Sequence, residues 1–205
     1  MGKTALTHTE RALKRMLDLV LALILLALTW WIILLAWAGA ALSTGMNGFF
    51  LQVRIGQWGR PFRIIKIRTM KADPAEPGST ITTADDPRIT PLGRWLRRTK
   101  IDEMPQLLNV LAGQMSFVGP RPDVPGFADR LEGDARMILC LKAGITGPAS
   151  LRFRDEERLL AVQPDPEAYN REVVFPAKVQ LNMEYIENYS LRRDVQYIIR
   201  TALGR

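Results

Sequence analysis

Residues 99–122 read TKIDEMPQLLNVLAGQMSFVGPRP, and this stretch sets the organisation of the whole chain. Two adjacent carboxylates, Asp102 and Glu103, precede Pro105. A helix accommodates proline only in its first turn, because proline lacks an N–H and clashes with the preceding turn. We therefore predict a helix that begins near Asp102, continues through a leucine-rich face and ends at Gly113, which suits a left-handed cap.

The predicted helix start gives these carboxylates a chemical role. Unpaired N–H groups and the positive end of the helix dipole keep a nearby carboxylate ionised, so we expect Asp102 to be charged and nucleophilic at neutral pH. After the helix, Pro120 and Pro122 hold the backbone rigid around Arg121, whose guanidinium suits phosphate oxygens. A structural alternative stays open, with Asp102 as a helix cap and Arg121 as a solvated loop residue.

This stretch resembles the signature of the bacterial sugar transferases, the monotopic phosphoglycosyl transferases. The family pattern is close to S/T-x-x-D-E-x-P-Q-L-x-N-V-x-x-G-x-M-S-x-x-G-P-R-P. The resemblance runs from Arg15 to about Ala202 and suggests a minimal, catalytic-core member. It implies an enzyme that transfers a sugar-1-phosphate from a UDP-sugar to a polyprenyl phosphate, such as undecaprenyl phosphate, and releases UMP. The lipid-linked product would begin the assembly of a polysaccharide such as an exopolysaccharide or lipopolysaccharide.

The implied reaction assigns roles to the two carboxylates. Covalent carboxylate catalysis divides one hard step into two easier ones, so Asp102 would attack the β-phosphate and form a phosphosugar–aspartyl intermediate. The polyprenyl phosphate would then displace Asp102. Magnesium prefers one or two carboxylates together with phosphate and water, so Asp102 and Glu103 suffice as Mg²⁺ ligands. Whether Glu103 holds the metal or orients the lipid phosphate stays open.

The remaining predicted site residues are basic groups and their frame. By position, Arg154 matches an arginine that the family places in its active site. A surface salt bridge to the acidic run 155–157 is the alternative. The predicted substrate-binding residues are Arg121, Arg154, Lys66, Arg68, Pro120 and Pro122.

Composition limits the classes of function. The net charge of +7 and a pI near 9.9 call for an anionic partner, which is nucleic acid, anionic lipid or a phosphorylated substrate. Cys140 is the single cysteine, so no disulfide forms within one chain. His8 is the single histidine, which argues against zinc chemistry and histidine-based triads.

A long apolar run points to a membrane. No charged residue occurs from Leu19 to Val53, and residues 17–38 are almost wholly apolar. Such a run can enter a bilayer. We predict a membrane anchor in residues 1–42 and a catalytic domain in residues 43–205, on the cytoplasmic face of the bacterial inner membrane. Basic residues flank the run on both sides, so a re-entrant helix and a single span both stay open. In the family a Ser-Pro pair breaks the helix, and Trp30 and Trp31 occupy the matching positions here.

The other segments predict an α+β fold that is mainly α, with amphipathic interfacial helices and a small β-hairpin around a compact domain. A pattern of local signals carries this prediction. The predicted segments are hairpin strands 49–54 and 61–70, a loop at 71–83, a turn at 85–88, an amphipathic helix at 91–100, a helix at 127–141, an extended segment at 151–154, and a helical run at 177–203 in which Ser190 caps a second helix.

Two other classes of protein account for part of the sequence. A nucleic-acid-binding protein explains the charge but has no use for the apolar run, so we expect no nucleic-acid partner. A non-enzymatic membrane scaffold explains the anchor but not the rigid turn around Arg121. The sequence leaves the sugar and the oligomeric state open, a homodimer included.

Overall fold

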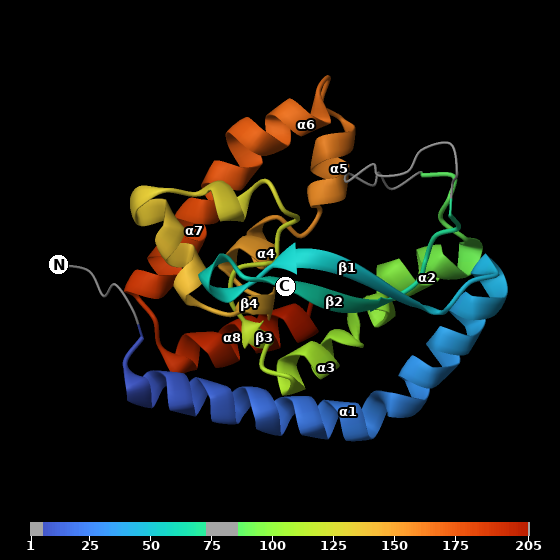
Figure 1. The fold of residues 1–205 in the computed structure, drawn as a ribbon, viewed down its shortest axis with the longest axis horizontal. Coiled ribbons are helices and arrows are strands. Elements are labelled where there is room, and N and C mark those ends of the chain that lie inside the picture. Colours follow the sequence, from blue (N-terminus) through green and yellow to red (C-terminus); the bar gives the residue numbers. More distant parts are fainter. Residues whose placement is uncertain (1–5, 73–85, 205) are drawn as a thin grey trace.

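The computed structural model describes residues 6–72 and 86–204, and this part of the chain is mainly helical with two small two-stranded sheets (Figure 1). The predicted mainly α class is confirmed. In chain order the elements are α1 (His8–Thr44), β1 (Phe49–Ile55), β2 (Pro61–Ile67), α2 (Pro91–Thr99), α3 (Gln106–Leu111), β3 (Met115–Val118), β4 (Ala143–Thr146), α4 (Pro148–Arg152), α5 (Glu156–Ala161), α6 (Pro166–Tyr169), α7 (Phe175–Glu187) and α8 (Leu191–Ala202).

Helix α1 contains the whole apolar run. Thr7 and Glu10 form a reciprocal capping box at its start, and Gly45 ends it in the left-handed region at φ 70°. By length and composition, α1 is the one helix of the described residues that could cross a membrane.

The helix is continuous at Trp30 and Trp31 but turns in its second half toward α2 (Figure 1). Two side chains donate to backbone carbonyls in this region. Thr29 Oγ1 lies 2.6 Å from the oxygen of Leu25, and Trp31 Nε1 lies 2.9 Å from the oxygen of Leu28. A Ser or Thr hydroxyl that bonds to the carbonyl four residues back, as Thr29 does, is associated with helix bending. The Thr29 contact offers a cause for a bend without proline.

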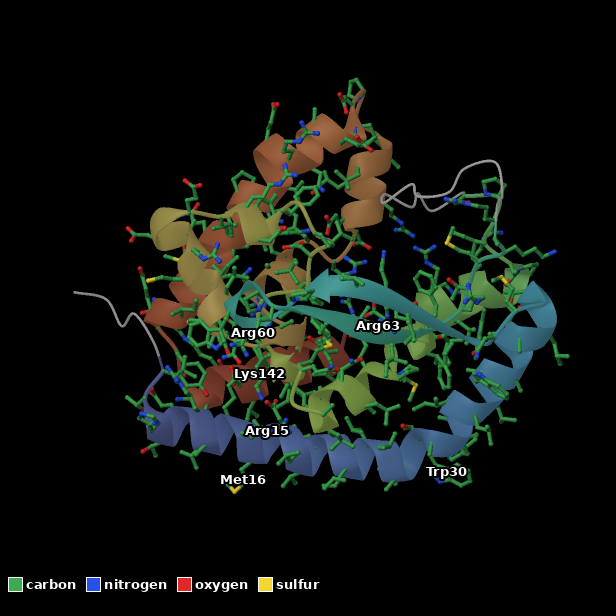
Figure 2. All side chains as sticks on the ribbon, in the orientation of Figure 1. Arg15, Met16, Trp30, Arg60, Arg63 and Lys142 are labelled. Carbon is green, nitrogen blue, oxygen red and sulfur yellow. The ribbon has the colours of Figure 1, made fainter. Side chains whose placement is uncertain are left out.

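The first turns of α1 are bound to the rest of the protein by polar contacts. Lys14 Nζ lies 2.7 Å from the buried carboxylate of Asp194 in α8. Arg15 donates to the carbonyls of Val110 and Leu111 at the end of α3. The Asp18 carboxylate accepts hydrogen bonds from Ser116 Oγ and from a main-chain N–H of β3. The outer side of α1 is apolar, and Met16 and Trp30 point away from the body of the protein (Figure 2).

The predicted β-hairpin is confirmed. Strands β1 and β2 pair antiparallel, from Phe49 opposite Ile67 to Ile55 opposite Pro61. The Asn109 side chain of α3 bonds to the backbone of β2, through the N–H of Ile65 at 3.0 Å and the carbonyl of Arg63 at 2.8 Å. This contact fixes β2 against α3.

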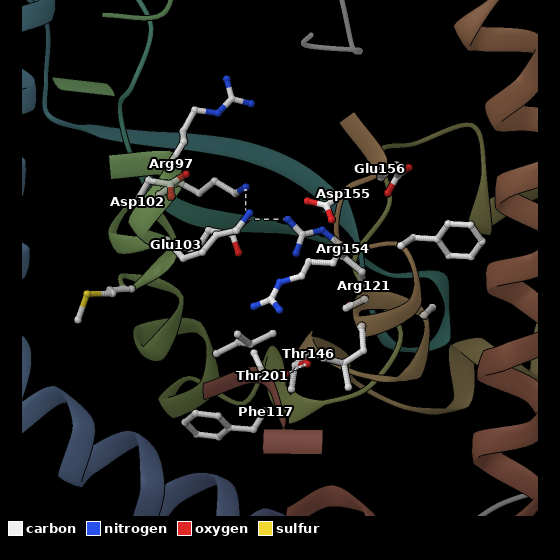
Figure 3. Close-up of a pocket in the computed structure, with 18 of the residues that line it drawn as sticks. Arg97, Asp102, Glu103, Phe117, Arg121, Thr146, Arg154, Asp155, Glu156 and Thr201 are labelled. Atoms are coloured by element: carbon white, nitrogen blue, oxygen red, sulfur yellow. Dashed lines mark hydrogen bonds and ion pairs between the residues drawn. The ribbon is translucent and has the colours of Figure 1, made fainter. Parts of the chain in front are cut away.

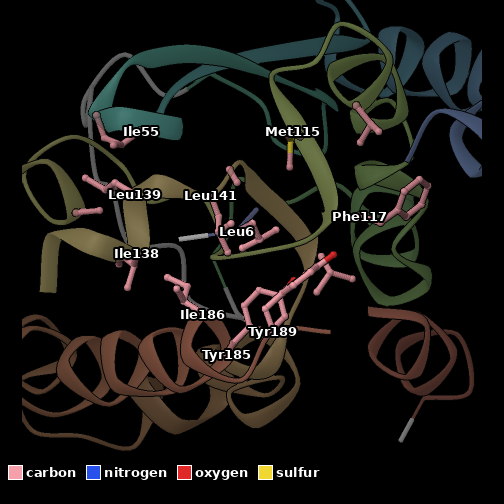
Figure 4. Packing of buried hydrophobic residues seen from close by; sticks show 14 of the residues in the cluster. Leu6, Ile55, Met115, Phe117, Ile138, Leu139, Leu141, Tyr185, Ile186 and Tyr189 are labelled. Atoms are coloured by element: carbon pink, nitrogen blue, oxygen red, sulfur yellow. The ribbon is translucent and has the colours of Figure 1, made fainter. Parts of the chain in front are cut away.

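Two clusters of buried side chains form the core. The larger one lies between the hairpin, the segment Gly133–Cys140 and α7, and includes Met115, Ile138, Leu139 and Tyr185 (Figure 4). The smaller one joins the second half of α1 to β2 and α2 through Ile33, Ala36, Ala40, Ile67 and Leu96.

Several local predictions stand and others are wrong. Helix α2 and the capped pair α7 and α8 are confirmed, with Ser190 accepting from the N–H of Arg193. The predicted helix 127–141 is instead two 3₁₀ segments, Ala128–Arg130 and Gly133–Cys140, because Gly133 turns the chain at φ 56°. The predicted extended segment 151–154 is wrong as well, because residues 151 and 152 end α4, which begins at Pro148, and residues 153 and 154 form a turn.

The sequence predicted no element for residues 115–118. They form β3, which pairs in parallel with β4. The predicted loop at 71–83 lies outside the described residues from position 73 on. Of the predicted turn at 85–88, the described part begins at Asp86, whose carboxylate lies 2.6 Å from the guanidinium of Arg88.

Candidate active site

The chain turns sharply just before the two acidic residues. Helix α2 ends where Lys100 adopts the left-handed conformation, at φ 59°, which is uncommon for a residue with a side chain. A 3₁₀ turn, Ile101–Glu103, then carries both carboxylates. The α-helical part begins only at Gln106, so the predicted helix start near Asp102 is wrong. Pro105 precedes this helix as its N-cap.

Asp102 is buried, with 7 % of its surface exposed, and its Oδ1 atom has no hydrogen-bond partner among the described residues. Burial, followed by the negative charge of Glu103, raises the pKa of Asp102 to about 6, although Lys66 opposes this shift. The local environment therefore acts against ionisation, contrary to the prediction from a helix dipole. With a pKa near 6, the carboxylate is still mostly ionised at pH 7.

Glu103 is the opposite case, because two cations hold it. Its Oε1 atom accepts from Lys66 Nζ at 3.0 Å and from Arg121 Nη2 at 2.7 Å. Burial opposes the charge of Glu103, but Arg121 and Lys66 outweigh burial and hold its pKa well below the usual value. Burial lowers the pKa of Lys66, and the charge of Glu103 raises the pKa of Arg121.

Glycines position Arg121 by allowing two backbones to touch. The N–H of Gly119 donates to the carbonyl of Thr146, and the N–H of Gly144 donates to the carbonyl of Pro120 at 2.7 Å. A Cβ atom on Gly144 would lie 2.2 Å from the nitrogen of Gly119, so neither backbone has room to move. The turn around Arg121 is thereby fixed to the end of β4.

A cavity of about 1080 Å³ lies over the acidic pair (Figure 3). Its walls come from segments far apart in the sequence, including α1, α2, α4, α7 and α8. Leu25 and Thr29 of α1 reach it, so the cavity extends to the apolar helix. Arg94, Arg97 and Arg98 of α2 add positive charge to its lining.

The structure brings most of the predicted site residues together. Asp102, Glu103, Arg121, Lys66 and Arg154 all line this cavity. Their roles in binding and catalysis stay predictions.

The other three predicted residues do not line this cavity. Arg68 donates to the carbonyls of Asn47 and Phe49 at the end of the hairpin. Pro120 and Pro122 frame the turn, and the carbonyl of Pro122 accepts from Arg54 at 3.2 Å.

Sequence reasoning missed several polar residues of the cavity. Lys178 Nζ lies 2.6 Å from Glu156, and burial raises the pKa of nearby Asp123 to about 6. Asn182 lies one turn after Lys178 on α7 and also lines the cavity. The sequence predicted only a helical run here, because nothing in its local pattern separates the wall of a cavity from a packed face.

The carboxylates suit a metal ion that is shared with substrate. No group of three or more His, Cys, Asp or Glu side chains that could hold a metal occurs in residues 6–72 and 86–204. Magnesium in phosphoryl-transfer sites needs only one or two carboxylates, since phosphate and water complete its shell. The unpartnered Oδ1 atom of Asp102 fits this requirement, whereas Glu103 Oε1 already accepts from two cations.

Comparison with known proteins identifies the family of the chain. The sequence pattern of the bacterial sugar transferases matches residues 9–204. The UDP-glucose:undecaprenyl-phosphate glucose-1-phosphate transferase of Escherichia coli is 34% identical over 204 residues, which is 97% of this chain and 41% of the relative.

Two further relatives differ in the sugar that their names give. The Caulobacter vibrioides UDP-glucose:undecaprenyl-phosphate glucose-1-phosphate transferase is 34% identical over 92% of this chain and 68% of the relative. A putative undecaprenyl-phosphate N-acetylgalactosaminyl 1-phosphate transferase of Bacillus subtilis is 41% identical over 60% of this chain and 69% of the relative. On the family match and the extent of these similarities, the chain belongs to the bacterial sugar transferase family.

Proposed function

We propose that this protein is a phosphoglycosyl transferase, which moves a sugar-1-phosphate from a UDP-sugar to undecaprenyl phosphate and releases UMP. The observation that carries the proposal is the unpartnered carboxylate of Asp102 beside the Glu103–Lys66–Arg121 cluster, in a cavity that reaches α1. Relatives with this reaction in their names support the choice of substrates. Their names give different sugars, so the sugar is left unassigned.

Asp102 is the nucleophile in this proposal. An oxygen of its carboxylate forms a bond to the β-phosphorus, and the bond from that phosphorus to the bridging oxygen breaks, so UMP leaves with the electron pair. An oxygen of undecaprenyl phosphate then attacks the same phosphorus, and the bond to Asp102 breaks. The carboxylate is regenerated, and the lipid diphosphate sugar is the product. Each step is a phosphoryl transfer, for which covalent catalysis divides the barrier.

The cations around Asp102 would stabilise charge in both steps. Arg121 and Lys66 would contact phosphate oxygens, because positioned cations are worth most where negative charge develops in a site shielded from water. Glu103 would hold these two cations in place rather than act as a second nucleophile. Bound Mg²⁺ would supply further neutralisation of the phosphates, with Asp102 as its protein ligand.

The acceptor would enter from the membrane side. Large apolar side chains on the outer face of α1 are exposed, as is Trp95 of the amphipathic helix α2. We therefore place both helices in the cytoplasmic leaflet of the inner membrane, with α1 re-entrant at its bend. Leu25 and Thr29 would then guide the isoprenoid chain to the cavity.

The decisive experiment compares Asp102→Asn with wild type and with Asp134→Asn, which changes an exposed aspartate. Detergent- or nanodisc-purified protein is incubated with Mg²⁺ and a panel of UDP-sugars, with and without undecaprenyl phosphate. Wild type and Asp134→Asn should release UMP, and without the lipid they should gain the mass of one sugar phosphate. Asp102→Asn should do neither.

Two outcomes would contradict the proposal. Substantial turnover by Asp102→Asn would exclude the covalent step. Silence of folded wild-type protein across the panel would favour a membrane scaffold.

A further inference from the structure

Unpaired buried polar atoms gather at the cavity. Within residues 6–72 and 86–204, four buried side-chain oxygens lack a hydrogen-bond partner, and those of Asp102, Ser150 and Asn182 belong to residues that line the same cavity. A buried polar group without a partner costs about 1–3 kcal/mol, so most are satisfied. The Asp102 oxygen has a use in the proposed reaction, but those of Ser150 and Asn182 do not.

Ser150 and Asn182 come from two helices that pack together, α4 and α7. Asn182 is 4 % exposed, and its unpartnered atom is the amide oxygen. Apolar and aromatic residues of the same two segments also line the cavity, including Phe153, Phe175 and Val179. Phe127 fixes the ring of Phe175 by an edge contact at 5.4 Å between centroids. These apolar side chains line the cavity together with Ser150 and Asn182, and we call this part of the lining the α4–α7 subsite.

Electrostatic interactions connect the acidic pair with α7. Arg121 binds Glu103, which is the main cause of its raised pKa, and Glu156 raises that pKa further. Glu156 in turn binds Lys178 at 2.6 Å, and Lys178 lies one turn before Asn182 on α7. Two cations that can bind a diphosphate, Arg121 and Lys178, thus line the same cavity as the reacting carboxylate and the two unpaired oxygens.

We propose that Asn182 and Ser150 form the recognition site for the uracil ring of the donor, an inference that rests on the proposed function. Uracil presents an N3–H donor beside a carbonyl acceptor. The Asn182 amide offers the matching acceptor and donor, and the Ser150 hydroxyl donates to a ring carbonyl. The apolar walls suit a flat ring, whereas a hexose carries several hydroxyls that would need more polar partners. A base site with specific hydrogen bonds discriminates strongly against a base with the wrong pattern.

The test compares UMP with CMP on the full-length protein in nanodiscs. Cytosine has an acceptor at N3 and a donor at N4, the reverse of uracil. We expect wild type to bind UMP more tightly than CMP, by titration calorimetry. Asn182→Leu has nearly the same volume and removes both hydrogen-bonding atoms. It should weaken UMP binding by at least about tenfold and abolish the preference, while its melting temperature stays the same or rises.

Asn170→Leu is the matched control. Asn170 also carries a buried, unpartnered amide oxygen, but it does not line the cavity. This variant should keep the wild-type UMP affinity and preference. If Asn182→Leu does not fold, Ser150→Ala and Asn182→Asp decide the matter, since each alters a hydrogen bond to the ring with little change of volume, and each should reduce the preference.

The outcomes separate the subsite from the reaction. Equal binding of UMP and CMP by wild type, or an unchanged preference in the folded Asn182 and Ser150 variants, overturns the inference. Loss of the preference in those variants supports it even if no UDP-sugar is turned over. Absence of turnover in wild type would instead count against the proposed function.

Discussion

Two neighbouring carboxylates in one 3₁₀ turn have opposite electrostatic environments. The pKa of Asp102 is raised by burial and by Glu103, whereas that of Glu103 is lowered because Arg121 and Lys66 outweigh burial. The two carboxylates consequently have different roles. Glu103 anchors cations, and Asp102 is left with a carboxylate oxygen that nothing in the described residues satisfies.

We predict opposite effects of neutralising the two residues on stability. The folded-state pKa of Asp102 is about 6, above the unfolded value of about 3.9, so its charge destabilises the fold above pH 6 and this cost disappears as the pH falls toward 4. Asp102→Asn should therefore raise the free energy of unfolding at pH 7 by about 1–3 kcal/mol. Urea unfolding in detergent measures this change.

Glu103→Gln should lower the free energy of unfolding at pH 7 by about 2–4 kcal/mol, because two cations lose their shared counterion. The Glu103 contribution is present above the unfolded pKa and is lost only as the pH falls through its low folded value. Stability changes of the same sign in the two variants would contradict this account of the pair.

The pH dependence of activity should follow Asp102. If its ionised form is the nucleophile, kcat/KM should fall about tenfold for each pH unit below about 6. A pH profile of kcat/KM for UMP release at limiting Mg²⁺ measures this acidic limb, because bound Mg²⁺ would lower the pKa of its ligand Asp102. Asp134→Asn is the control and should show the same limb as wild type. An acidic limb near pH 4 would show that the pKa of Asp102 is not raised in the free enzyme.

At the scale of elements, the close contact between the end of β3 and β4 determines where Arg121 lies. Gly144 faces the backbone of Gly119, and the two segments exchange main-chain hydrogen bonds around Pro120. The position of the Arg121 guanidinium thus depends on the parallel pair β3 and β4, which no local sequence pattern predicts.

We predict that Gly144→Ala separates these backbones. The new Cβ would meet main-chain atoms at 2.2–2.6 Å, which costs about 1–3 kcal/mol and displaces Arg121. We expect kcat/KM to fall by at least about tenfold, since small misplacements of a positioning group are costly in catalysis. Gly39→Ala is the control, because its Cβ would meet only the side-chain tip of Leu92. Equal activities would show that the strand contact does not position Arg121.

Sequence patterns with local causes predicted their elements well. The hairpin, α2 and the cap at Ser190 follow from turn residues, periodicity and a side chain that bonds within one helical turn. The parallel pairing of β3 with β4 depends on residues about 28 positions apart, so periodicity gives no sign of it. The same holds for the 3₁₀ segment Gly133–Cys140, where packing overrides a helical pattern.

The candidate site shows the same division. The contiguous motif predicted that Asp102, Glu103 and Arg121 belong to one site. In the structure all three line the cavity, and Arg121 binds Glu103. The pKa shifts of Asp102 and Glu103 could not be predicted from the motif, because they depend in part on Lys66, which is 37 positions from Glu103. Asn182 and Lys178 had no signal at all, because their helix has no motif and their role in the cavity depends on its packing against α4.

At the scale of the whole molecule, α1 connects the cavity to the apolar surface. Its outer side is exposed and apolar, its inner side carries the contacts of Lys14, Arg15 and Asp18, and its second half packs on α2. This arrangement favours a helix that enters and leaves the membrane on one side, since both of its ends belong to the same folded body.

We predict that both ends of α1 face the same side of the membrane. Cys140 is the single cysteine, so Cys140→Ser gives a background for reporter cysteines at Thr9 and Met46, which lie at exposed positions near the two ends. A membrane-impermeant maleimide should label both reporters in inverted vesicles and neither in intact cells. Labelling from opposite sides would establish a single span.

The ion pair between Lys14 and Asp194 also bears on the order in which the protein is made. During translation Lys14 is synthesised with the first helix, and its counterion Asp194 is synthesised 180 residues later. Throughout that interval the nascent chain carries a positive charge at a position that becomes buried only in the finished protein. The contact that fixes α8 against α1 therefore forms only after α8 has been synthesised. A chain released before α8 is synthesised leaves Lys14 without this counterion.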